Sequence, residues 1–213
     1  MGYFMVHLKV AQKLLGSNNN IKDISAFYKG SLAPDAIMFR QGCQHSEKAL
    51  THFCVGDEGW GYYTNYDEWE NSLKSNIQKY NDTINPDFIF GYFTHIFTDI
   101  AYTSRFWTPV RLTLDKNYIE DYIKDCIEID SRLLESLENK EQVWSLLKQS
   151  TDYYLPDTVN ADDLTRLIGE MIHNMYNNRK SNLEYKFKVI TLSDMLDFAE
   201  VTAAKINESV FTI

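Results

Sequence analysis

Glycine and proline are scarce in this sequence. Nine glycines and four prolines are spread over 213 residues, so the signals that end a helix lie far apart. A hydrophobic content of 44 % excludes a disordered chain, and the 14 tyrosines and 12 phenylalanines suit a large core. These features predict an all-α protein, and the length predicts one domain over residues 1–213.

Three further absences narrow the class of protein. The three cysteines, Cys43, Cys54 and Cys126, form no CxxC pair, which favours free thiols in a reducing compartment. No basic leader precedes a long apolar segment, and no segment is long and apolar enough to span a bilayer, so we expect a cytoplasmic protein without a transmembrane segment. The formal net charge of −9 disfavours nucleic acid as a partner and suits a bound cation. The oligomeric state stays open.

The most apolar part of the chain is residues 85–107. It begins with Asn85-Pro86, a typical helix start with an N-cap residue before proline. The segment is apolar on nearly every face, which predicts a buried helix at the centre of a multi-helix bundle. His95 and Asp99 are four residues apart in it and therefore project from one face. A core His–Asp hydrogen bond and a shared metal ion both explain such a buried pair.

Hydrophobic spacing and capping residues predict helices on both sides of this segment. The expected ranges are 4–15, 21–29, 66–80, 115–138, 140–149, a helix opened by Asn160, and a last helix capped by Ser193 that runs to about residue 210. Residues 36–65 are expected to be irregular apart from a short helix near 46–51, and Thr108-Pro109 is expected to end the central helix.

Charged residues on the predicted helix 115–138 divide into two groups. Most of its acids are expected to form a solvated face: Glu120, Asp121, Asp125 and Glu128. Asp130 lies near the apolar stripe and is the acid we expect to partner an arginine.

Several polar residues lie where a ligand or a structural role would both be reasonable. His7 lies on the apolar stripe of its helix, and Asp35 follows a proline, where a turn or cap is the common role. His45 lies in a polar run and is expected to be solvated, and an ion pair is favoured over a metal site for Glu170 and His173.

Four sequence elements together resemble the zinc-dependent phospholipase C family. They are an early histidine on an apolar helix, then GSLAPD, KALTHF and FGYFTHIFTDI, and they cover roughly residues 5–107. The likeness is to short, intracellular-type members. It implies an all-α bundle with metal ions at its centre, a His₂Asp₂ site made of Asp35, His52, His95 and Asp99, and a further metal position that His7 shares with Asp99.

The chain also departs from the family pattern. It begins Met1-Gly2-Tyr3, whereas family members with three metals use an N-terminal tryptophan. No histidine lies between His95 and His173, so a second cluster of two histidines and a glutamate is missing unless Glu170 and His173 rebuild it. We therefore expect one divalent metal, zinc first, with iron or manganese also suiting these ligands, and a second, weaker site at His7 and Asp99.

The resemblance implies a metal-dependent hydrolase of small-molecule or lipid phosphoesters. A metal-bound water would attack, no side-chain base is assigned, and Arg105 or Arg111 would hold the anionic group unless both form ordinary salt bridges. The alternative is a non-catalytic metal-binding helical domain, which the missing second cluster favours. An open coordination position would distinguish the two. A phosphohydrolase of the HD type is disfavoured because the chain has no His-Asp dipeptide.

Overall fold

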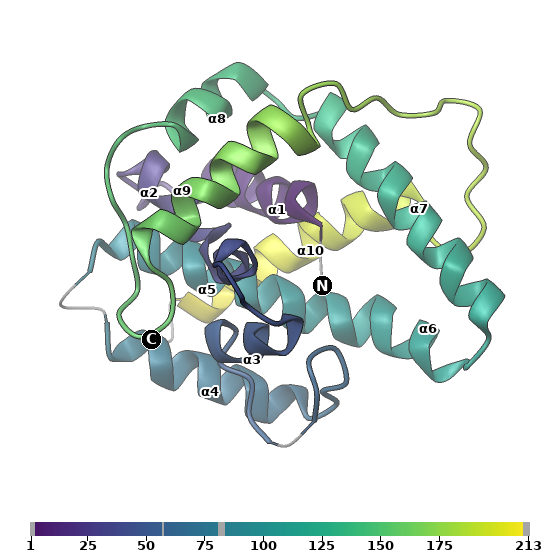
Figure 1. Cartoon of the computed structure of the whole chain (residues 1–213), viewed down its shortest axis with the longest axis horizontal. Coiled ribbons are helices and arrows are strands. Elements are labelled where there is room, and N and C mark those ends of the chain that lie inside the picture. Colours follow the sequence, from purple (N-terminus) through teal and green to yellow (C-terminus); the bar gives the residue numbers. More distant parts are fainter. Residues whose placement is uncertain (1–2, 57, 81–83, 211–213) are drawn as a thin grey trace.

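The computed structural model describes residues 3–56, 58–80 and 84–210, and this part of the chain is helical (Figure 1). One isolated antiparallel bridge joins Leu155 and Val159, and no named strand occurs among the described residues. The all-α multi-helix fold expected from the scarcity of helix breakers is therefore confirmed.

The helices follow the predicted ranges closely. Their bounds are α1 Phe4–Ser17, α2 Ile24–Gly30, α3 Lys48–Thr51, α4 Tyr66–Gln78, α5 Pro86–Tyr102, α6 Thr108–Leu112, α7 Lys116–Glu135, α8 Lys140–Leu147, α9 Ala161–Glu170 and α10 Leu192–Val210. Two 3₁₀ segments, Ala33–Phe39 and His45–Glu47, and two π turns, Thr103–Trp107 and Met171–Met175, complete the helical structure.

Helix α5 is the buried centre of the fold, as expected. Almost all of its residues from Phe88 to Tyr102 are buried, and α1, α2, α4 and α10 pack around it (Figure 1). Its contact with α2 is unusually close because each helix presents a glycine. A Cβ on Gly30 would collide with the carbonyl of Phe88, and one on Gly91 would collide with the carbonyl of Phe27. This approach brings the residues after α2 against His95.

The expected end of the central helix at Thr108-Pro109 is wrong. The chain keeps helical dihedral angles through the π turn Thr103–Trp107 and continues as α6, with Pro109 in its first turn. A π turn shifts the hydrogen-bonding register, which accommodates a proline that cannot donate. Helix α5 and α6 are therefore nearly continuous.

The cap residues were predicted correctly in three cases and wrongly in one. Asn85, Asp115 and Asn160 each accept hydrogen bonds from the first-turn backbone of α5, α7 and α9. Helix α10 begins at Leu192, before the expected cap at residue 193. The Thr191 hydroxyl accepts from the Asp194 N–H, and the Asp194 carboxylate accepts from the Thr191 N–H.

The acids of α7 are not all on a solvated face, which corrects the prediction for Asp125 and Glu128. Asp125 is fully buried and accepts hydrogen bonds from the backbone N–H groups of residues 188, 189 and 190. Glu128 accepts from the Asn182 N–H. Asp130 pairs with Arg179 at 3.0 Å, as expected. These carboxylates hold the long segment between α9 and α10 against α7.

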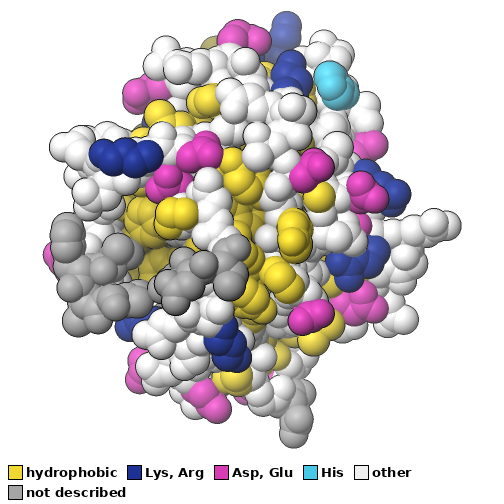
Figure 2. All heavy atoms as spheres, turned by 90° about the vertical axis from the view of Figure 1, so that its left-hand side faces the viewer, with side chains coloured by type: hydrophobic (Ala, Val, Ile, Leu, Met, Phe, Trp, Pro, Cys, Tyr) yellow, Lys and Arg dark blue, Asp and Glu magenta, His cyan; other side chains and the backbone are white. Residues whose placement is uncertain are grey.

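Two surface properties bear on the class of protein. Among the described residues, no helix combines the length and the hydropathy that a bilayer-crossing segment requires. Figure 2 shows charged side chains of both signs interspersed over one face, with apolar side chains gathered towards its middle.

Candidate metal centre

The five residues proposed as metal ligands meet at one place in the core. His7 comes from α1, Asp35 from the first 3₁₀ segment, His52 from the end of α3, and His95 and Asp99 from α5. None of the five is more than 5 % exposed. Two overlapping groups, His7/Asp35/His95 and His52/His95/Asp99, have donor atoms close enough to share an ion.

The distances within the His₂Asp₂ set fit a small divalent ion. His52 Nε2 lies 3.3 Å from His95 Nε2, 3.4 Å from Asp35 Oδ1 and 3.3 Å from Asp99 Oδ2. His95 Nε2 lies 3.8 Å from Asp35 Oδ1 and 3.9 Å from Asp99 Oδ2. A tetrahedral zinc site with bonds of roughly 2.0–2.1 Å holds its ligand atoms about 3.4 Å apart. The side chains need only small shifts to reach that geometry.

Hydrogen bonds on the far side of each ring fix which nitrogen faces the centre. His95 Nδ1 lies 2.8 Å from the carbonyl of Ser31, and His52 Nδ1 lies 2.8 Å from the carbonyl of Lys48. A carbonyl can only accept, so both Nδ1 atoms must donate. In its neutral form each ring then points its Nε2 lone pair at the centre, which is the arrangement that second-sphere carbonyls impose on metal-binding histidines.

The charges of the centre leave room for a cation. Burial lowers the pKa of His95 well below its ordinary value and that of His7 to about 4, so both rings are neutral. Burial alone would raise the pKa of Asp35, but Lys48 and His52 hold it well below the usual range, and the pKa of Asp99 is also lowered. Two carboxylates thus stay ionised in the core.

His7 extends the cluster beyond four ligands. Its ring stacks on that of His95 with centroids 3.7 Å apart, and neither of its nitrogens has a hydrogen-bond partner among the described residues. His7 Nε2 lies 3.5 Å from Asp99 Oδ1, while His52 faces the other oxygen of that carboxylate. The two oxygens of Asp99 thus face different histidines. A carboxylate that lies between two metal ions has the same arrangement. Met1 and Gly2, which depart from the family pattern, lie outside the described residues.

Lys48 and Trp60 complete the centre, and the sequence reasoning missed both. Lys48 is 7 % exposed, forms an ion pair with Asp35, and lies 4.8 Å from the centre of the Trp60 ring. The Trp60 ring also covers His52, with centroids 4.4 Å apart. A lysine four residues before His52 on a short helix was the available signal, because residues at that spacing share a face.

The remaining candidates lie away from this cluster. Arg105 pairs with Asp197 of α10 at 2.8 Å, and Arg111 stacks over Tyr62. Among the described contacts neither arginine meets a cluster residue, and their role with a substrate stays a prediction. His45 is exposed, as expected.

The expected ion pair between Glu170 and His173 does not form, because Glu170 instead accepts a hydrogen bond from Asn174 at 2.6 Å. Both Glu170 and His173 are exposed, at the end of α9 and in the π turn that follows it. These residues therefore show no sign of rebuilding a second metal cluster.

Comparisons with protein-family models, with curated proteins and with solved structures find no match to this chain.

Proposed function

We propose that this protein binds a divalent metal ion in the centre formed by Asp35, His52, His95 and Asp99. The observation that carries the proposal is the pair of Nε2 atoms of His52 and His95, 3.3 Å apart in a fully buried site. Two lone pairs facing each other beside two carboxylates are unfavourable unless a cation lies between them. Imidazole and carboxylate ligands suit zinc first, and also iron and manganese.

The family resemblance and the geometry together suggest hydrolysis of a phosphoester as the activity. A divalent ion in such a site polarises a phosphoryl oxygen and makes a bound water a nucleophile near neutral pH. The His7–Asp99 pair supports this reading because a closed structural site needs only four ligands, and this centre offers five. Lys48 and Asp35 mark the least buried side of the centre, where the ammonium would meet an anionic substrate.

The alternative is a non-catalytic centre that holds the helices together. Its support is the burial of the ligands, because His52, His95 and Asp99 are each 0 % exposed. A single ion there would link the first 3₁₀ segment, α3 and α5, which are separate elements of the fold. Such a site stabilises the folded chain without offering a position to substrate.

Calorimetric titration of chelator-treated protein with zinc tests the proposal. We expect about one tight site per chain in the wild type and no tight site in His52→Ala. The matched control is His45→Ala, which removes an exposed histidine seven residues away and should bind like the wild type. Equal binding by all three proteins would place the ion elsewhere and overturn the proposal.

Assays on the zinc-loaded protein then separate the two roles. We expect hydrolysis of bis(p-nitrophenyl) phosphate or p-nitrophenyl phosphate that His52→Ala lacks. In a cobalt-substituted sample, added azide should change the visible spectrum if a coordination position is open. Zinc binding without hydrolysis and without an azide response would establish the non-catalytic alternative.

A further inference from the structure

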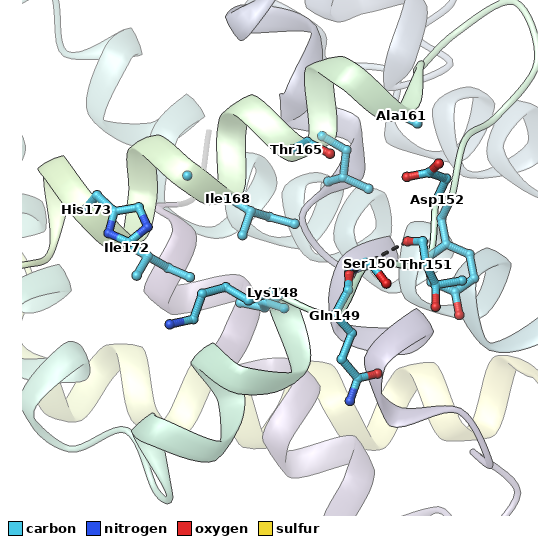
Figure 3. A pocket seen from close by; sticks show the side chains of 15 residues that line it. Lys148, Gln149, Ser150, Thr151, Asp152, Ala161, Thr165, Ile168, Ile172 and His173 are labelled. Carbon is cyan, nitrogen blue, oxygen red and sulfur yellow. Dashed lines mark hydrogen bonds between the residues drawn. The ribbon is translucent and has the colours of Figure 1, made fainter.

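A cavity of about 380 Å³ lies apart from the metal centre, between α9, the end of α8 and the segment that joins them (Figure 3). In Figure 3, Ile168 of α9 and Ile172 and His173 of the π turn that follows it project towards Lys148. Ser150 and Thr151 lie beside the cavity on the connecting segment. The size is within the range of small-molecule sites, near its lower end.

The cavity walls are apolar where they are deepest. The buried residues that line it are Leu147 of α8, Leu164 and Ile168 of α9, and Ile172 of the π turn after α9. Gly169 also lines it, and a Cβ built on this glycine meets no atom within 4 Å. The apolar walls favour an organic ligand over a bare inorganic ion.

One buried cation, Lys29 of α2, lines the same cavity. Lys29 is 4 % exposed, and its ammonium donates to the carbonyls of Gln149 and Thr151. No carboxylate among the described residues lies within ion-pair distance of it, although an ammonium has three N–H groups and buried charges are normally paired. The Lys29 ammonium also lies 5.4 Å from the centre of the Tyr153 ring, and burial lowers its pKa although the carboxylates of Asp152 and Asp23 act to raise it.

The other charged residues of the cavity lie at its rim and are of mixed sign. Lys148, Asp152 and His173 are all exposed. Solvent screens these groups, so the rim does not determine the sign of a ligand. The deep charge does, because Lys29 lies where the dielectric constant is lower.

We propose that this cavity binds a small organic anion, with its apolar body against α9 and its carboxylate-type group on the Lys29 ammonium. The ligand would add a negatively charged acceptor to the two carbonyls and the Tyr153 ring that already contact this lysine, a kind of partner that no described residue places within ion-pair distance. The site is separate from the proposed metal centre and shares no residue with it.

Isothermal titration with hexanoate tests this inference on the full-length protein. Hexan-1-ol has a body of similar size without the charge, inorganic phosphate has charge without an apolar body, and hexylamine has the opposite charge. We expect saturable binding of hexanoate and an affinity lower by about ten-fold or more for each of the other three compounds. For hexan-1-ol this factor corresponds to the loss of one charged hydrogen bond. Equal affinity for hexanoate and hexan-1-ol would overturn the assignment of Lys29.

Two variants locate the site. Lys29→Met should weaken hexanoate binding by about ten-fold or more, and Gly169→Leu should abolish it by filling the cavity without a clash. Gly16→Leu is the matched control, because Gly16 also has open space around its Cβ position but does not line this cavity. Gly169→Leu keeps the Lys29 contacts, so it tests the site even if Lys29→Met unfolds. Unchanged binding in Gly169→Leu would contradict the inference.

The metal centre must be excluded as the place where the carboxylate binds. His95→Ala should lose the divalent ion and still bind hexanoate like the wild type. Loss of hexanoate binding in His95→Ala would assign the anion to the metal centre and overturn the separate site.

Discussion

Two groups of buried carboxylates in this protein have opposite surroundings. Asp125 on α7 is fully buried and accepts three backbone N–H groups and the Tyr185 hydroxyl. Asp35 and Asp99 at the centre face histidine nitrogens instead, and Lys48 is the cation paired with Asp35. Asp125 therefore holds a chain segment in place, whereas Asp35 and Asp99 face nitrogen atoms of the histidine rings. The comparison shows that burial alone does not mark a ligand site, whereas the identity of the facing atoms does.

The largest effect should come from removing the proposed ion. Chelation should destabilise the wild type by about 4 kcal/mol when the free ion had been present at a thousand times its dissociation constant. The same treatment should leave His95→Ala unchanged. Thermal unfolding with and without chelator measures the difference. An equal response in the wild type and in His95→Ala would mean that Asp35 and Asp99 hold no ion, so they would not differ from Asp125 in this respect.

Loss of the α7 carboxylate should damage the fold and spare the metal. Asp125→Ala removes the acceptor of three backbone N–H groups, of which that of Ile190 is buried, and this costs about 1–3 kcal/mol. We expect urea unfolding to show that loss while zinc binding per folded chain stays at the wild-type value. Glu120→Ala is the matched control, because Glu120 lies on the exposed part of α7. A loss of zinc from folded Asp125→Ala would show that the two regions are coupled.

Acid should destabilise the metal-free protein through its neutral histidines. Burial lowers the pKa of His7 from 6.5 to about 4. Between pH 4 and 6.5, His7 is therefore protonated in the unfolded chain and neutral in the folded chain. The free energy of unfolding consequently falls as the pH falls through this range. His7→Gln should reduce the slope by up to about 1.4 kcal/mol per pH unit in this window. The measurement is the free energy of unfolding of chelator-treated protein at pH 4 to 7.

Asp130 should act in the opposite direction. Burial raises the pKa of Asp130 from 3.8 to about 6, so between these pH values the folded chain holds a proton that the unfolded chain has lost. The contribution of Asp130 to the free energy of unfolding therefore falls as the pH rises through this range. Asp130→Asn should therefore steepen the rise of stability with pH that the histidines produce. A shallower rise in this variant would contradict the assigned surroundings of Asp130.

The smallest effect on zinc binding should come from Lys48. Removing its charge in Lys48→Met takes a competing cation away from Asp35, so zinc should bind more tightly, by about ten-fold. The metal-free variant should be less stable than the wild type because Asp35 then lacks its partner. Weaker zinc binding would instead mean that Lys48 orients Asp35 for the ion.

The sequence was informative where a pattern is local. The period of apolar residues located the helices, and Asn85, Asp115 and Asn160 marked three helix starts correctly. The four-residue spacing of His95 and Asp99 correctly placed both on one face of a buried helix. The clustering of His7, Asp35 and His52 around them followed only from the family resemblance, because no local spacing links residues on separate elements.

The errors arose where distant segments decide the outcome. Asp125 was assigned to a solvated face because its helical position is polar, but residues 188–190 return to cover it. The π turn that carries the helix past Pro109 has no simple sequence signal. Lys48 was overlooked because a lysine is rarely buried, and only the folded chain shows that it pairs with Asp35 inside the core.

The most direct test of the account is the metal content of protein purified without chelator. Elemental analysis should be made side by side on the wild type, His95→Ala and His45→Ala. We predict about one zinc or iron per chain in the wild type and in His45→Ala, and none in His95→Ala. A wild-type protein that stays free of metal, even after incubation with zinc, would mean that the facing histidines and carboxylates are a hydrogen-bonded core and would contradict the central claim.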